Sequence, residues 1–222
     1  METELTAFVR RVFACSPQAA EAIAARAGER VYAAREVLLR QGESCSQTWL
    51  VMAGRAQALV YGAEGQLVML QDFGPGDLFG AVAQLETGPC EADVVAVEQL
   101  WALLFLALDF VRLIETDGAV GLAVSRMLLR QLRAATGRIV ERTTLTAAGR
   151  AYAELLRLAT SDETGRRVIA PAPVLSALAV RINATRETVS RAVSVLERRG
   201  IVAREDGVMV IVAPGRLEEL IV

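Results

Sequence analysis

A short two-faced helix near the C-terminus constrains this chain more than any other stretch. Its polar face, at relative positions zero, one, four and five, consists of Arg186, Glu187, Ser190 and Arg191. Its apolar face, at zero, three, four and seven, consists of Val189, Ala192, Val193 and Leu196. One face can therefore pack on a core while the other reaches solvent. Arg pairs with guanine and Glu accepts from cytosine, so the polar face predicts readout of DNA bases. The alternative is a solvated helix face.

The flanking sequence gives this helix a setting. Residues 174–183 have a helical pattern, and Asn183 can adopt the left-handed conformation of a tight turn. Thr185 can then cap the next helix. Residues 208–212 form a strand pattern after Asp206 and Gly207, which together signal a hairpin turn. Helix, three-residue turn, helix and hairpin predict a winged helix-turn-helix.

The charges are divided unevenly along the chain. The net charge of −2 separates into −4 for residues 1–142 and +2 for residues 143–222. Residues 166–204 hold eight Arg against Glu187 and Glu197, a net charge of +6. A basic patch on an otherwise acidic protein is typical of a DNA-binding module.

Composition excludes several other classes of protein. The apolar content of 53% favours an ordered core, and the acidic start of the chain is unlike a signal peptide. The longest apolar run, residues 100–108, is well short of the ~20 residues that span a bilayer. We therefore expect a cytoplasmic protein without membrane contact.

The residues that usually carry catalysis or bind metals are scarce. The chain has no His, and Cys15, Cys45 and Cys90 are too widely spaced for a zinc or iron–sulfur pattern. We expect no metal, no iron–sulfur cluster and no haem. The sequence Gly74-Pro75-Gly76-Asp77 lacks the form of a phosphate-binding loop and is interpreted as a turn. We therefore expect the chain not to be an enzyme.

The centre of the chain changes from strands to helix. Residues 42–88 hold 8 of the 17 Gly, between short apolar runs, which predicts a compact β-roll. Residues 119–142 then have a helical pattern that only the isolated Gly121 and Gly137 weaken. A coiled-coil spacing within it predicts a dimer seam of Leu128, Leu132, Ala135 and Ile139. A monomer would bury this seam on its own core. Met127 and Leu129 are expected to pack on the roll instead.

Several motifs, in order along the chain, resemble the superfamily of the cyclic-AMP receptor and the fumarate-nitrate regulator (CRP/FNR). They are Arg40-Gln41-Gly42-Glu43, Val51-Met52-Ala53-Gly54-Arg55, residues 74–80, residues 179–191 and residues 196–201. The resemblance implies an α+β fold with three parts. These are an effector-sensing β-roll (jelly roll) of the cyclic-nucleotide-binding type with N-terminal helices (1–108), a dimerisation helix (109–142) and a winged helix-turn-helix domain (143–222).

The resemblance also assigns roles on DNA. It implies that Arg186, Glu187 and Arg191 read bases, with Ser190 adding a hydroxyl where other members carry Gly. Thr185 and Thr188 are expected to hold phosphates. A homodimer would bind an inverted repeat with half-sites ~34 Å apart, and RNA polymerase is an expected partner.

The chain departs from the family pattern at the cyclic-nucleotide phosphate site. Members that bind cyclic AMP carry Glu after the Gly at position 80 and an Arg-Ser pair ten residues later, but here these positions are Ala81 and Cys90-Glu91. A carboxylate ~4 Å from a phosphate opposes it by about 4 kcal/mol. The adenine-contacting position falls at Ala135 or Thr136. We expect a degenerate effector pocket (Gly80, Ala81, Cys90, Glu91, Ala135, Thr136) that binds neither cyclic AMP nor cyclic GMP.

Three alternatives stay open at the level of sequence. The effector either differs from cyclic AMP and cyclic GMP or is absent. The alternative function is a small-molecule sensor that acts through protein contacts with a vestigial helix-turn-helix. Cys90 is either a redox sensor or an inert buried thiol, and the acidic residues beside it favour the inert thiol.

Overall fold

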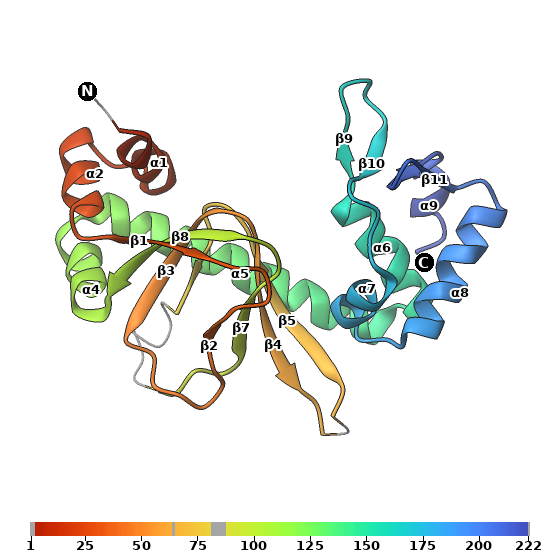
Figure 1. The fold of residues 1–222 in the computed structure, drawn as a ribbon, viewed down its shortest axis with the longest axis horizontal. Helices are drawn as coiled ribbons and strands as arrows, with labels where there is room; N and C mark the ends of the chain where they lie inside the picture. The colour runs from red at the N-terminus through yellow and green to blue at the C-terminus, as the bar shows by residue number, and fades with distance from the viewer. Residues whose placement is uncertain (1–2, 64, 81–87, 222) are drawn as a thin grey trace. The chain divides into compact units, whose positions relative to one another are not determined.

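The computed structural model describes residues 3–63, 65–80 and 88–221. It has two compact units, Met1–Val60 with Leu70–Ala135 and Tyr61–Met69 with Thr136–Val222. Figure 1 shows their elements in chain order. The predicted α+β class, with a β-roll, a long helix and a helix-turn-helix, is confirmed. The domain boundaries expected at residues 108 and 142 separate parts of the chain by function, so they stay a prediction.

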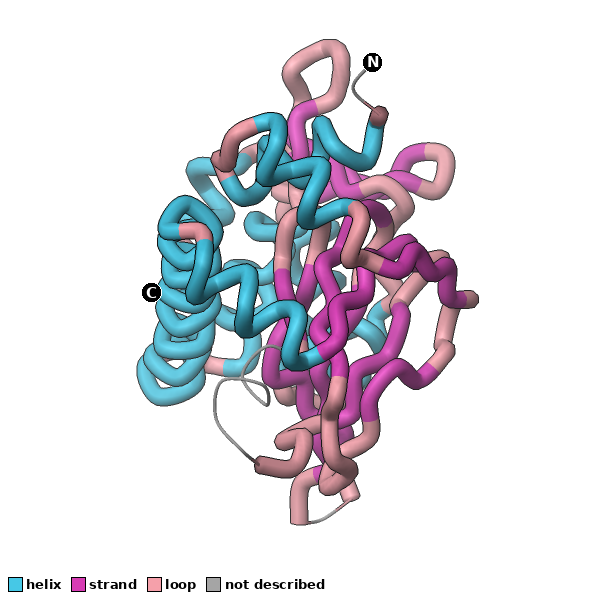
Figure 2. Tube along the Cα trace, turned by 90° about the vertical axis from the view of Figure 1, so that its left-hand side faces the viewer, coloured by secondary structure: helices cyan, strands magenta, loops and turns pink. Residues whose placement is uncertain are grey.

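The roll consists of two four-stranded sheets, whose strands are magenta in Figure 2. The first sheet has the order β1 (Gly28–Tyr32), β8 (Leu100–Leu106), β3 (Gln47–Ala53) and β6 (Leu78–Phe79). The second has the order β2 (Val37–Leu39), β7 (Asp93–Ala96), β4 (Ala56–Tyr61) and β5 (Leu67–Phe73). The short apolar runs between the glycines of residues 42–88 form β3, β4 and β5, as the predicted β-roll requires.

The interior of the roll is built from the alternate residues of these strands. Val51, Leu100 and Ala102 are fully buried, as expected for residues of one period-two face. Trp49 stacks on Phe79 with a centroid distance of 5.3 Å, and its indole nitrogen donates to the hydroxyl of Tyr32 at 2.9 Å. The polar edge of the indole is therefore satisfied beside an apolar core.

Helices close one end of the roll around a second apolar cluster. These are α1 (Glu4–Phe13), α2 (Pro17–Ala24), α4 (Ala107–Thr116) and the first half of α5 (Gly118–Thr144). Ser16 caps α2, with Pro17 in its first turn. The helical region expected from Asp109 divides at Asp117, because Asp117 has extended backbone and its carboxylate accepts from the Ala119 N–H at 2.9 Å. Asp109 lies inside α4 and does not cap it.

Helix α5 buries one face and leaves an apolar stripe on another. The buried residues are Val120, Ala123, Val124 and Met127. The exposed stripe, as we call it from here on, consists of Leu122, Leu129, Leu132, Ile139 and Val140, each more than half exposed. Leu128 of the predicted seam is instead partly buried against the core, and Leu129, expected on the roll, belongs to the stripe.

The second unit contains the helix-turn-helix and its wing. Its helices are α6 (Ala147–Leu158), α7 (Leu175–Ile182), α8 (Arg186–Arg198) and α9 (Pro214–Glu218). Its sheet has the order β11 (Val202–Glu205), β12 (Val208–Ile211), β10 (Arg167–Ile169) and β9 (Thr160–Ser161). The predicted hairpin turn is present at Asp206 and Gly207, both with positive φ. Among the described residues, no helix combines the length and apolar character needed to cross a bilayer.

Candidate functional site

The turn between α7 and α8 has the predicted local geometry. Asn183 is left-handed, with φ of 50°, and the Ala184 N–H donates to the carbonyl of Ala179 at 3.0 Å. The Thr185 hydroxyl accepts from the backbone N–H of Thr188 at 3.3 Å, which caps α8. These bonds satisfy backbone groups at both helix ends and fix where α8 begins.

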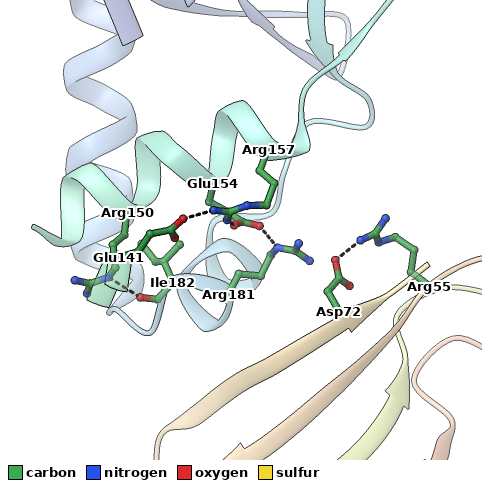
Figure 3. Close-up of polar contacts among 8 residues, drawn as sticks. All are labelled: Arg55, Asp72, Glu141, Arg150, Glu154, Arg157, Arg181 and Ile182. Atoms are coloured by element: carbon green, nitrogen blue, oxygen red, sulfur yellow. Dashed lines mark hydrogen bonds and ion pairs between the residues drawn. The ribbon is translucent and has the colours of Figure 1, made fainter. Parts of the chain in front are cut away.

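Arg150 of α6 also holds this turn in place, a role that no sequence pattern predicts. Its guanidinium donates to the carbonyls of Ile182 at 3.0 Å and Leu145 at 3.0 Å. Figure 3 shows the bond to Ile182. Ile182 ends α7, so a cation here both bonds a terminal carbonyl and complements the helix dipole.

A buried carboxylate joins α6 to α7. The side chain of Glu154 is 3% exposed and forms ion pairs with Arg157 and Arg181. Arg157 also pairs with Glu141 near the end of α5, so four side chains form one network (Figure 3). Glu154 and Arg181 are 27 residues apart, and only the fold brings them together.

The polar face of α8 is presented as predicted from its spacing. Arg186, Glu187 and Arg191 are exposed and Ser190 is half-buried, and these four side chains line one surface hollow. On the opposite face, Val189, Ala192, Val193 and Leu196 are all buried. The helix therefore has no freedom to turn this face inward without exposing its apolar side.

Charges on this face are arranged around Glu187. Hydrogen bonds from its own backbone amide and from the Thr185 hydroxyl, with the charges of Arg186 and Arg191, lower the pKa of Glu187. It is therefore an ionised acceptor at neutral pH, with a guanidinium on either side. The hydroxyls of Thr185 and Thr188 lie 3.1 Å apart at the N-terminus of the same helix.

The roll contains a cavity of about 680 Å³. Of the residues expected at a degenerate effector pocket, Gly80, Cys90 and Glu91 line it, and Ala81 lies outside the described residues. Ala135 and Thr136 are not among its described lining residues. The residues of α5 that line it are Leu128 and Gln131, which come earlier in the helix.

The backbone around the cavity explains why position 80 is Gly and how the Cys90 segment is held in place. Gly80 has φ of +78°, and a Cβ there would lie 2.5 Å from the carbonyl oxygen of Gln47, so only Gly fits. The Cys90 N–H donates to the Glu43 carbonyl, and the Cys90 carbonyl accepts from Gly42, both at 2.8 Å. These bonds hold the Cys90 segment against the segment that follows β2.

The Cys90 thiol is shielded from ionisation. Burial, followed by the neighbouring Cys45 thiol, raises the pKa of Cys90 to about 11. A thiol with such a pKa is a poor nucleophile at neutral pH. The proximity of Cys45 could not be read from a sequence in which 44 residues separate the two. Within the described ranges, no group of three or more Cys, Asp or Glu is placed to hold a metal ion.

Comparisons with known proteins agree on both units. Residues 29–117 match the cyclic nucleotide-binding domain family, and residues 149–220 match the Crp-like helix-turn-helix domain family. The cyclic AMP receptor protein of Thermus thermophilus is 28% identical over 193 residues, which cover 86% of this chain and 87% of that protein.

Solved structures share the fold. FixK2 from Bradyrhizobium japonicum aligns with a TM-score of 0.74 at 24% identity, covering 87% of this chain and 96% of that one. A CRP/FNR-family transcriptional regulator from Thermus thermophilus aligns with a TM-score of 0.72 at 22% identity, covering 87% of this chain and 98% of that one.

Proposed function

This chain belongs to the CRP/FNR superfamily of transcription regulators, and we propose that it acts as a homodimer that reads an inverted repeat in DNA through α8. The observation that carries the proposal is the exposed face of α8. Two guanidiniums flank an ionised Glu187 on that face, while the opposite face is buried in the domain core. A vestigial helix would have no physical reason to keep this arrangement.

Each side chain of the face has a proposed role. Arg186 and Arg191 would bond guanine edges, Glu187 would accept from cytosine, and Ser190 would add a hydroxyl contact. The paired hydroxyls of Thr185 and Thr188 stand at a helix N-terminus, which favours a phosphate oxygen. In this proposal RNA polymerase is the protein partner, and the regulator works in the cytoplasm without catalysis of its own.

The exposed stripe of α5 supports the dimer. Leucine, isoleucine and valine on one face of a helix are costly to leave in water, and the same face of a second copy would cover them. Two members of the predicted seam, Leu132 and Ile139, belong to the stripe. Leu128 contacts the core of its own roll, so we move the proposed seam toward Leu122, Leu129 and Val140.

We propose that the effector, if there is one, is not cyclic AMP or cyclic GMP. Glu91 lines the cavity where family members that bind cyclic AMP place an Arg-Ser pair for the phosphate. Isothermal titration calorimetry of the full chain with cyclic AMP should show no binding at micromolar concentrations. A dissociation constant in the low micromolar range would contradict this part of the proposal.

The DNA proposal is tested by binding to labelled duplexes. Fluorescence anisotropy should show binding to a selected palindromic duplex ~10³-fold or more tighter than to a random duplex at physiological salt. Raising the salt concentration should weaken binding to both, because phosphate contacts release counterions. A chain that binds both duplexes equally, or neither, would support the alternative sensor with a vestigial helix-turn-helix.

A further inference from the structure

The roll has a one-sided charge composition around its cavity. Between Arg55 and Arg112 the sequence contains no Arg or Lys, but it contains eight Asp and Glu. Among the described residues that line the cavity, Glu91 is the only charged one, and it is exposed. No cation from this stretch can neutralise a bound anion.

The rest of the cavity wall is apolar with a few neutral polar groups. Leu39, Phe73, Leu78 and Phe79 are among its apolar residues. Its polar side chains include three amides, Gln41, Gln71 and Gln131. The Gln131 amide is fixed, because it donates to the Leu78 carbonyl at 2.6 Å. The high pKa of Cys90 keeps its thiol neutral at physiological pH, so this part of the wall adds no charge.

This wall discriminates against charged ligands of either sign. An anion would leave water without gaining a cation, and Glu91 would add a repulsion that solvent weakens but does not remove. A cation would also lose its hydration, and its pairing with Glu91, weakened by the same solvent, would not offset that loss. An uncharged molecule avoids both penalties, and apolar walls with a few amides suit its burial and orientation.

We propose that the roll cavity binds an uncharged, mainly apolar organic molecule that carries one or two hydrogen-bonding groups for the amides. The inference rests on the proposed function only in treating the cavity as an effector site. It excludes nucleotides, carboxylates and sulfonates as the class of ligand. The cavity of about 680 Å³ lies within the usual range for small-molecule pockets.

Two fluorescent probes with the same aromatic body provide the test. N-phenyl-1-naphthylamine is uncharged, and 1-anilinonaphthalene-8-sulfonate differs from it by one sulfonate. Titration of the full chain should give a Kd for the uncharged probe at least about tenfold lower than for the sulfonate. Equal or tighter binding of the sulfonate would overturn the proposal, and so would failure of both probes to bind.

Three variants test whether the probe binds in the cavity and whether Glu91 accounts for the preference for the uncharged probe. Gly88→Trp should weaken binding of the uncharged probe about tenfold or more, because Gly88 lines the cavity. No atom of the described residues beyond its chain neighbours lies within 4 Å of where a Cβ would be, so we expect the variant to fold. Glu91→Arg should strengthen binding of the sulfonate about tenfold and change binding of the uncharged probe little. Glu29→Arg, on the exposed part of β1, changes the net charge equally and should change neither.

The outcomes separate this proposal from the DNA proposal. Unchanged probe binding in a folded Gly88→Trp variant would mean that the probe binds outside the cavity, and the inference would fail. Binding of the same preparations to the palindromic duplex depends on α8, which no cavity variant alters. If the chain prefers the uncharged probe but does not bind the palindromic duplex, only the proposed function is contradicted.

Discussion

At the scale of single residues, Arg191 carries the most specific prediction. It is exposed on the polar face of α8, beside the ionised Glu187. Arg191→Ala should cost ~1–3 kcal/mol of binding to the palindromic duplex and relax discrimination at one base pair of each half-site. Competition binding with single-base variants of the duplex measures both effects.

The matched control is Arg216→Ala, which removes the same charge from an exposed position on α9. It should leave discrimination unchanged. If Arg191→Ala weakens binding to random DNA as much as to the palindrome, Arg191 contacts phosphate only.

Glu154 is the residue on which the packing of α6 and α7 depends. Glu154→Gln would remove the buried carboxylate that pairs with Arg181, whose side chain is 11% exposed. We expect a loss of about 3 kcal/mol in the free energy of unfolding, because breaking a buried ion pair by removing one partner is strongly destabilising. Urea denaturation followed by circular dichroism measures it. Glu163→Gln, at an exposed position, should stay within about 0.5 kcal/mol of the parent.

Cys90 gives a pH-dependent prediction. Its pKa is raised to about 11 in the folded chain, against ~8.5 in an unfolded one. The stabilising contribution of the neutral thiol is therefore complete below pH ~8.5 and is lost as the pH rises through 11. At pH 8.5, iodoacetamide should alkylate Cys90 at least about 100-fold more slowly in the native protein than in urea. Peptide mass spectrometry measures the rates, and similar rates would contradict the buried thiol.

At the scale of elements, the turn between α7 and α8 depends on a left-handed backbone at position 183. Asn183→Ala should destabilise the second unit by about 1 kcal/mol, because a Cβ without a compensating polar group is strained at φ of 50°. Asn183→Gly should be neutral within a few tenths of a kcal/mol. Thermal unfolding of the pair tests the turn, and equal melting temperatures for the two variants would speak against a strain effect.

At the scale of the whole molecule, the proposed dimer rests on the exposed stripe of α5. Leu132→Glu places a charge at the centre of the proposed seam and should convert dimers to monomers at micromolar concentration, since a buried unpaired charge costs several kcal/mol. Analytical ultracentrifugation measures the distribution. Ala134→Glu, an exposed position on a different face of α5, should remain dimeric. A monomeric parent protein would refute the seam.

Local patterns in the sequence determined most of the elements. The period of α8, the turn signals at Asn183 and Asp206-Gly207, and the glycine-separated strands each depend on near neighbours, and the structure places them as predicted. The break at Asp117 was missed, because a carboxylate inside a helical pattern gives no sign that it will cap the next helix. The predictions for Leu128 and Leu129 in α5 were wrong for a similar reason. Several apolar residues of this helix could pack on the roll, and the helical pattern does not show which of them the roll covers.

The sequence by itself determined the two faces of α8, the absence of basic residues between Arg55 and Arg112 and the presence of Cys90-Glu91 where the family resemblance implies an Arg-Ser pair. Only the tertiary structure decided which distant residues meet. It brings Arg150 to the end of α7, Glu154 between two arginines and Cys45 beside Cys90, and it gathers three amides on the mainly apolar wall of one cavity. The physical reason is that periodicity and turn chemistry act over a few residues. Burial and charge pairing instead depend on contacts between residues far apart in the sequence, which form only when the whole chain folds.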